Sequence, residues 1–406
     1  MTTLSLPVPA PDALAASHAL QQLILDDISS HAGWIPFSRY MELALYAPDL
    51  GYYSGGATKL GKDGDFTTAP EMSSLFGASL ATLAADLLKQ TTPQIMEFGA
   101  GTGKLALDFL TECQSSGIVI DRYFIVELSG ELRARQEVLL RDFPQVVWLQ
   151  QMPEAFCGLV IGNEVLDAMP VDLVIKTEQG WREIGVAAVT QETPARLIYR
   201  ERPEQTEQTE QTGQVGQSDI ADHIAQIPDA EQLPVGYMTE VHAVASGFMH
   251  SLAQMLKAGH ADTGLGSMAI LIDYGFPAAE YYHPQRHQGS LMCHYRHHAH
   301  PDPFYLPGLQ DITAHVDFTA MAKAALDGGV ELLSYTSQAS LLIEAGITQL
   351  LSRTSAEQVM HYLPQANALQ KLVSPAEMGE LFKVLMVGCQ MDLPSGLLRQ
   401  DRSHRL

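Results

Sequence analysis

The chain has 406 residues, 46% of them hydrophobic, which is enough to bury the core of one large domain or of two ordinary ones. Its 47 acidic residues outnumber the 24 basic ones, and the formal net charge of -23 argues against binding to nucleic-acid phosphates, which depends on Lys and Arg. The excess of acid would attract a cationic substrate, or it serves only to keep the protein in solution.

The cysteines and the N-terminus bear on the cellular compartment. The four cysteines lie far apart and form no CxxC pair, which argues against a disulfide framework and against a cysteine zinc site. The first residues lack the basic start and apolar stretch of a signal peptide, and no segment reaches the roughly 18 to 20 apolar residues of a membrane helix. We therefore predict a protein of a bacterial-type cytoplasm with no membrane span.

The N-terminal part is predicted to be helical. Apolar positions recur at helical spacing over residues 12–30 and 37–46. Residues 51–77 are rich in Gly, Ser and Thr, and we interpret them as a long loop that enters a helix near Pro70. A loop of this length is usually functional or disordered, and its aromatic residues favour an ordered one.

Strands and helices then alternate, as is typical of an α/β fold with a parallel sheet. The predicted strands cover residues 94–98, 123–127, 146–149 and 159–162, and the predicted helices cover 104–113 and 131–142. After Pro170, three strand-like segments without helices predict an antiparallel hairpin or meander. This part is expected to form an inserted subdomain.

The rest of the chain returns to the core. Residues 204–212 repeat Glu-Gln-Thr three times, which predicts a flexible surface loop. Further predicted elements are a helix over about 241–257, the buried strand MAILIDYG, a His-rich segment over 283–300, helices over 317–326 and 337–352, and strands over 332–335 and 381–387.

The strongest local motif is IMEFGAGTGKL, in which a strand ending at Glu97 leads into Gly99, Gly101 and Gly103 before a helix. Glycines let the backbone approach a ligand closely, and the N-terminus of the helix offers free N–H groups. The dinucleotide fingerprint needs Gly or Ala where Lys104 stands, and the P-loop pattern also fits less well than ExGxGxG. The motif therefore predicts a nucleotide-like cofactor, with a tight structural turn as the alternative.

Two later segments add polar residues at strand ends. Glu127 ends the next strand, at about the right distance from the glycines for a carboxylate that binds ribose hydroxyls. The segment IGNEVLDAMPVD places Asn163, Glu164 and Asp167 at the carboxyl edge of the sheet, where open α/β folds hold their ligands. The alternatives are an exposed strand end and a plain connecting loop.

With these motifs, the chain resembles the MidA-type S-adenosylmethionine (SAM)-dependent methyltransferases, a family that includes mitochondrial assembly factors for respiratory complex I and bacterial relatives. The matching stretches, in family order, are GYYSGG, GDFTTAPEMSSLFG, EFGAGTGKL, GNEVLDAMPVD, LIDYGF, GSLMCHYRHH and LQDITAHVDF. Ala100 and Thr102 depart from the Pro and Arg of many members but leave the glycines in place.

The resemblance implies an α/β fold, namely a Rossmann-like class I methyltransferase with a seven-stranded sheet, a helical N-terminal extension and an inserted α+β subdomain. We divide the chain into a helical extension with a cofactor-covering loop (1–90), the SAM-binding half of the core (91–190), the insertion (191–235) and the second half of the core (236–406). SAM is the implied cofactor.

Site residues are carried over by position. The predicted cofactor-binding residues are Asp65, Phe66, Thr67, Glu71, Glu97, Gly99, Gly101, Gly103 and Glu127. The predicted catalytic residues are Asn163, Glu164 and Asp167. For the stretch that begins at Asp65, a plain helix-capping role of its threonines is the alternative.

The mitochondrial members imply an arginine of a partner protein, such as a subunit of a respiratory NADH dehydrogenase, as the methyl acceptor. The expected reaction is an in-line displacement, in which the enzyme mainly positions the reactants. Glu164 and Asp167 would orient a guanidinium through paired N–H bonds. A homodimer through the N-terminal helices is a further expectation.

Other hypotheses stay open at this point. The histidines His294, His297, His298 and His300 suggest a metal, but their spacing matches no standard site and we expect none. The chain could also be a non-catalytic assembly protein that keeps the SAM fold, or a nicotinamide-dependent dehydrogenase, which the residue after the third glycine disfavours.

Overall fold

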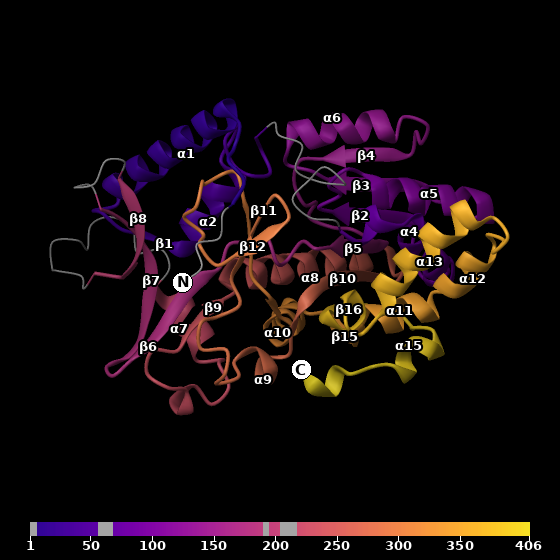
Figure 1. Ribbon diagram of the computed structural model, residues 1–406. Coiled ribbons are helices and arrows are strands. Elements are labelled where there is room, and N and C mark those ends of the chain that lie inside the picture. Colours follow the sequence, from indigo (N-terminus) through magenta and orange to yellow (C-terminus); the bar gives the residue numbers. More distant parts are fainter. Residues whose placement is uncertain (1–5, 56–67, 190–194, 204–216) are drawn as a thin grey trace.

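Two large sheets organise the computed structural model, which describes residues 6–55, 68–189, 195–203 and 217–406 (Figure 1). The core sheet contains β2 (Gln94–Phe98), β3 (Arg122–Val126), β4 (Val146–Leu149), β5 (Leu159–Asn163), β10 (Ser267–Phe276), β15 (Glu331–Ser337) and β16 (Phe382–Cys389). Their order is β15-β16-β10-β5-β2-β3-β4, and the short β14 (Val316–Asp317) pairs with the end of β10 as an eighth strand. The predicted α/β fold with a seven-stranded sheet is thus confirmed, with one short strand added.

The central strands run parallel, and β16 is antiparallel to both of its neighbours. The strands β5, β10 and β16 consist almost wholly of buried residues. Their near-continuous apolar sequences follow from this burial, because helices cover both faces of the sheet.

Two hydrophobic clusters fill the space between the sheet and its helices. On one face lie α4 (Ser74–Leu87), α5 (Lys104–Ser116), α11 (Gln338–Glu344), α12 (Ile347–Ser352) and α13 (Val359–Val373). On the other face lie α8 (Ala243–Thr263) and α10 (Phe318–Gly328). The helix α6 (Gly130–Leu139) follows β3, and the short α14 (Met378–Leu381) and α15 (Ser395–Arg399) flank β16 in sequence.

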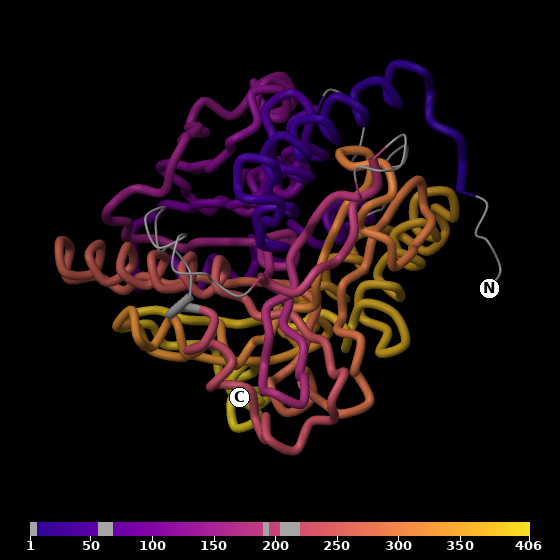
Figure 2. Tube along the Cα trace, turned by 90° about the vertical axis from the view of Figure 1, so that its left-hand side faces the viewer, coloured from indigo at the N-terminus to yellow at the C-terminus, as the bar shows by residue number. Residues whose placement is uncertain are grey.

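The second sheet is antiparallel and contains β1 (Ile35–Pro36), β6 (Asp172–Thr177), β7 (Gly180–Val189), β8 (Arg196–Glu201) and β9 (Met238–Val241). The N-terminal helices α1 (Pro11–Ser30) and α2 (Phe37–Tyr46) share a hydrophobic cluster with it. Both views place these helices, in indigo, above the magenta strands (Figure 1, Figure 2). The strands of this sheet come from residues before, within and after 191–235. The division of the chain at these positions stays a prediction.

Smaller elements complete the chain. The strands β11 (Met292–Tyr295), β12 (His298–His300) and β13 (Asp311–Thr313) form a third sheet within and after the His-rich segment. The short helices are α3 (Ala69–Met72), α7 (Gln217–Ile224), α9 (Ala278–Tyr281), η1 (Ala230–Gln232) and η2 (Ser403–Arg405). Among the described residues, no helix is long and apolar enough to cross a membrane.

One predicted helix was wrong in detail, and one helix was not predicted. The helix predicted over 337–352 is divided into α11 and α12, because Gly346 between them takes a left-handed φ of 84°. The helix α13 was not predicted, and it contains Pro364 in its interior, where proline removes a helical hydrogen bond.

The close approach of α8 to the chain before β5 gives a first testable prediction. A Cβ added at Gly259 would lie 2.0 Å from the carbonyl oxygen of Phe156, whereas one added at Gly247 in the same helix would meet nothing within 4 Å. We expect Gly259→Ala to lower the free energy of unfolding by about 1–3 kcal/mol. The control Gly247→Ala should raise it by about 0.5–1 kcal/mol, because alanine is the better helix former. Urea unfolding of both variants checks this, and a shift of the same sign in both would contradict the contact.

Candidate active site

A cavity of about 1470 Å³ lies beyond the carboxyl ends of β2, β3 and β5, and α2 contributes to its wall. Open α/β sheets bind ligands at this edge, where the strand order reverses, as it does on either side of β2. Eight predicted site residues line it, namely Glu71, Glu97, Gly99, Gly101, Glu127, Asn163, Glu164 and Asp167. Gly103 forms the N-cap of α5 instead. Asp65, Phe66 and Thr67 lie outside the described residues.

The glycine loop between β2 and α5 needs its glycines. Gly99, Gly101 and Gly103 have φ values of 65°, 53° and 86°, in the left-handed region that favours glycine. A Cβ at Gly99 would also lie 3.0 Å from Cγ2 of Val165 in the loop after β5. Any larger residue at this position would therefore strain the backbone and press on the neighbouring loop.

The glycine loop is held against α6 by a buried glutamine that the sequence analysis missed. The Nε2 of Gln136 donates to the carbonyl oxygen of Gly101 and to Oε2 of Glu127, both at 2.9 Å. Its Oε1 accepts from the indole of Trp148 on β4 at 2.9 Å. The side chain carries no sequence signal beyond an ordinary helical glutamine, so its role appears only in the structure.

The carboxylate of Glu127 is fixed from two sides. Besides Gln136, the backbone N–H of Ser129 donates to its Oε1 at 2.8 Å. Burial raises the pKa of Glu127, and these two donors oppose the rise. Each carboxylate oxygen has further acceptor capacity, which a pair of ribose hydroxyls could use.

Glu97, at the end of β2, is almost fully buried and also lines the cavity. The hydroxyl of Tyr123 donates to its Oε2 at 2.6 Å. Burial raises the pKa of Glu97 to about 7, against the hydrogen bond from Tyr123, and repulsion from Glu127 adds to the rise. Its carboxyl group therefore changes charge near neutral pH in the ligand-free protein.

The segment after β5 carries the predicted catalytic residues. Glu164 has a φ of 54°, which is rare for a residue with a side chain and suggests a function. The Nδ2 of Asn163 donates to Oε1 of Glu164 at 3.0 Å. Among the described residues, the buried Oδ1 atoms of Asn163 and Asp167 have no hydrogen-bond partner. Such atoms are costly unless a ligand or water satisfies them.

The two acids of this segment repel one another. Burial raises the pKa of Glu164 to about 8, and repulsion from Asp167 adds to the rise. Burial also raises the pKa of Asp167 to about 6, while hydrogen bonding from Tyr274 lowers it. A cation placed between the carboxylates would relieve both effects.

The helix α3 contacts both halves of the cavity. The hydroxyl of Thr102 in the glycine loop donates to Oε1 of Glu71. The backbone N–H of Ala69 donates to the carboxylate of Glu164. This short helix therefore connects the predicted cofactor loop with the predicted reaction centre.

The opposite wall comes from α2 and the loop after it. Tyr46 stacks on Tyr53 with ring centroids 5.5 Å apart, and its hydroxyl donates to the carbonyl oxygen of Ala168 at 2.9 Å. The hydroxyl of Tyr53 donates to both carboxylate oxygens of the buried Asp311 at 3.0 Å. Tyr53 belongs to the GYYSGG stretch, whereas Tyr46 is the last residue of α2.

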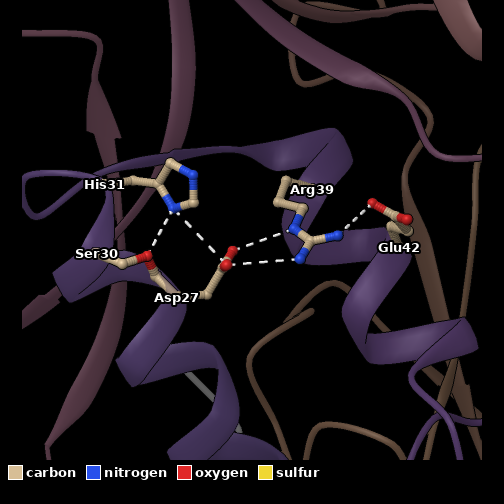
Figure 3. A network of polar contacts seen from close by, with 5 residues as sticks. All are labelled: Asp27, Ser30, His31, Arg39 and Glu42. Atoms are coloured by element: carbon tan, nitrogen blue, oxygen red, sulfur yellow. Dashed lines mark hydrogen bonds and ion pairs between the residues drawn. The ribbon is translucent and has the colours of Figure 1, made fainter. Parts of the chain in front are cut away.

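The cavity is strongly acidic. Its wall holds eight acidic side chains, three of which are Glu42, Asp49 and Glu131, and two basic ones, Arg39 and Lys104. Both basic side chains are already paired. Arg39 lies between the carboxylates of Asp27 and Glu42 (Figure 3), and Lys104 pairs with Asp108. The cavity therefore favours a cationic ligand.

The four histidines of the metal hypothesis, His294, His297, His298 and His300, lie on β11, β12 and the turn between them. The backbone of His294 on β11 pairs with that of Asp311 on β13. Within the ranges that the structure describes, no group of three or more His, Cys, Asp or Glu side chains is placed to hold a metal ion.

The sheet order, the glycine loop and the acid at the end of the neighbouring strand define a class I methyltransferase. Residues 77–336 match the model of a family described as "Putative S-adenosyl-L-methionine-dependent methyltransferase", and the chain belongs to this family. The predicted cofactor, SAM, is thereby confirmed, and the dehydrogenase alternative falls away. The glycines with left-handed φ and the fixed carboxylate of Glu127 fit this cofactor.

Known proteins similar over nearly the whole chain support the same assignment. A crystal structure of a Burkholderia thailandensis protein bound to S-adenosyl-homocysteine is 49% identical, covers 99% of this chain and 100% of its own, and superposes with a TM-score of 0.87. The mitochondrial protein arginine methyltransferase NDUFAF7 of Danio rerio is 27% identical over 92% of this chain and 88% of its own length. The human protein of the same name is 27% identical over 86% and 79%. The resemblance to the MidA-type family is thus confirmed.

Proposed function

We propose that this methyltransferase modifies an arginine side chain of a partner protein. The observation that carries the proposal is the pair of buried, unpartnered oxygens on Asn163 and Asp167 beside the carboxylate of Glu164, in a cavity whose two basic side chains are already paired. A guanidinium supplies several N–H donors and a positive charge in one plane, which matches these acceptors. The names of the mitochondrial relatives agree with this acceptor.

In the proposed arrangement, Glu127 accepts from the ribose hydroxyls of SAM and the glycine loop lies along its amino-acid end, near Glu97. Bound SAM supplies an electrophilic methyl group. Glu164 and Asp167 hold the guanidinium through charge-assisted hydrogen bonds and direct one nitrogen toward that methyl group. Asn163 orients Glu164 through its side-chain amide.

The nitrogen forms a bond to the methyl carbon as the bond from that carbon to sulfur breaks, and it then carries one proton too many. Glu164 and Asp167 lie next to the reaction centre and take up this proton. Burial suits both carboxylates to this role, because it favours their protonated form.

The raised pKa values predict how cation binding depends on pH. The pKa of Asp167 is about 6 and that of Glu164 about 8, so both groups become charged as the pH rises through this window. We expect the affinity for N-acetylarginine methylamide, measured with S-adenosylhomocysteine bound, to rise over the same window. The uncharged analogue N-acetylcitrulline methylamide should show no such rise, and equal profiles for the two would contradict the proposed site.

The raised pKa values also determine whether the ligand-free protein gains or loses stability as the pH rises. A carboxyl group whose folded pKa is raised holds its proton more tightly in the folded state. Glu164 therefore contributes most to the stability of the ligand-free protein below its unfolded pKa of about 4.5. This contribution is lost as the pH rises toward about 8.

As partner, we propose a subunit of a respiratory NADH dehydrogenase, by extension from the mitochondrial relatives. A cytoplasmic location and a homodimer complete this proposal. A candidate partner can be tested with radiolabelled SAM and with the arginines of the labelled protein replaced by lysine.

The first experiment is calorimetric titration with SAM, S-adenosylhomocysteine and NAD. We expect micromolar binding of the first two and no binding of NAD, followed by transfer of labelled methyl to arginine in a candidate partner. Tight binding of SAM with label on lysine or on a small molecule would contradict the proposed acceptor. Binding without transfer to any partner tested would favour the assembly-protein hypothesis.

A further inference from the structure

The end of β10 receives the backbone of the loop that carries the proposed catalytic residues. The N–H of Glu164 donates to the carbonyl oxygen of Ile272 at 2.8 Å. The next three N–H groups, of residues 165–167, all donate to Oδ2 of Asp273, at 3.1, 2.9 and 3.2 Å. Four consecutive amides of this loop are thus satisfied by two adjacent residues of one strand.

Asp273 lies outside the cavity wall. The residue is 1% exposed and is not among the residues that line the cavity. Its other oxygen, Oδ1, accepts from the backbone N–H of Tyr274 at 2.9 Å. The carboxylate therefore makes four hydrogen bonds to backbone amides, so its contacts act on the course of the chain rather than on a ligand.

The loop needs such a support for two reasons. Glu164 has a left-handed φ, which costs free energy in a residue with a side chain. Of the amides that follow, those of Leu166 and Asp167 are buried and that of Val165 is partly buried, and without Asp273 they would be left without this acceptor. The acid is itself poorly placed, because burial and repulsion from Asp167 and Glu164 raise its pKa. The hydrogen bonds from the backbone amides of Tyr274 and Leu166 oppose this rise.

We propose that Asp273 is the positioning residue of the reaction centre: by gathering the amides of residues 165–167 on one oxygen, it sets the directions of the Glu164 and Asp167 side chains toward the acceptor. The inference rests on the proposed function for the roles of those two acids. It also gives a function to the LIDYG segment, whose residues do not line the cavity.

The test compares Asp273→Asn with Asp317→Asn. Asparagine keeps the shape of the side chain but removes its charge and one acceptor. Asp317 is a matched control, because it is also buried and also accepts two backbone N–H groups, those of Thr319 and Ala320 at the start of α10, away from the cavity. Both variants are expected to lose thermal stability, so stability alone does not distinguish them.

Three measurements follow on each full-length protein. Hydrogen exchange reports on the amides of residues 165–167, and calorimetry reports on binding of S-adenosylhomocysteine and then of N-acetylarginine methylamide. For Asp273→Asn we expect about tenfold faster exchange of these amides and about tenfold weaker binding of the arginine probe, with S-adenosylhomocysteine affinity within about twofold of wild type. For Asp317→Asn all three values should remain those of the wild type.

Unchanged exchange and unchanged probe binding in Asp273→Asn would overturn the inference, and so would an equal loss of S-adenosylhomocysteine binding, since the residue would then support the whole domain. If Asp273→Asn does not fold, Asp273→Glu, which keeps the charge and moves it by one methylene, is measured with the same expectations. Failure of the wild type to bind the arginine probe would contradict the proposed acceptor, while the exchange rates would still decide on Asp273.

Discussion

Replacing Glu164 with glutamine should reduce methyl transfer to an arginine acceptor by about a hundredfold to a thousandfold. The amide keeps the shape of the side chain but loses the charge, and it presents an NH₂ group where the guanidinium needs an acceptor. The backbone of Glu164 would keep its hydrogen bond to Ile272. We therefore expect the loop to stay in place and the loss to fall on turnover and acceptor binding.

Steady-state kinetics with labelled SAM, together with calorimetry, separate these effects. Binding of S-adenosylhomocysteine by Glu164→Gln should remain within about threefold of wild type, because the proposed cofactor contacts lie on the glycine loop and on Glu127. Glu112→Gln is a suitable control, since Glu112 is also buried but pairs with Arg353 outside the cavity. Full activity in Glu164→Gln would remove Glu164 from the reaction centre.

Replacing Glu127 with alanine should weaken the binding of SAM and of S-adenosylhomocysteine by about tenfold to a hundredfold, the range expected when a hydrogen-bonded charged group is lost. The effect has two sources. The acceptors for the ribose hydroxyls disappear, and Gln136 loses the partner that orients it toward the carbonyl oxygen of Gly101.

Calorimetry at several SAM concentrations checks the prediction, with Glu137→Ala as the control. Glu137 lies on the exposed side of α6, where it pairs with Arg133, and its loss should change affinity by less than about twofold. With saturating SAM, Glu127→Ala should recover most of its turnover, because the chemistry takes place elsewhere in the cavity. Unchanged affinity would place the ribose away from Glu127.

The predicted elements of the core agree closely with the structure because their signals are local. The strand predicted over 94–98 is β2, and the glycines after it have the positive φ values that the motif implies. The segments after Pro170 form the antiparallel strands β6, β7 and β8. The prediction of one helix over 337–352 was wrong at Gly346, which separates α11 from α12. A glycine within a helical pattern can continue the helix or end it, and the tertiary structure decides between the two.

The site residues also fall into two groups, those identified by local motifs and those placed by tertiary packing. Those in motifs at strand ends, such as Glu97 and Glu127, could be named from the sequence, because parallel strands bring their carboxyl ends to one edge. The sequence implied a cofactor-covering loop within residues 1–90 but did not identify the wall at Tyr46 and Tyr53, because the position of α2 at this edge depends on its packing with the second sheet.

The sequence by itself determined the class of fold through periodic apolar patterns, and a nucleotide-like cofactor site through the glycine motif. The family and its cofactor SAM followed from the resemblance of the motifs along the chain. Only the tertiary structure decided which side chains support the motifs. Gln136 and Asp273 satisfy loop amides and carbonyls from elements that lie 35 and 106 or more residues away in the chain. Such contacts have no sequence period, because they depend on which elements the folded core brings together.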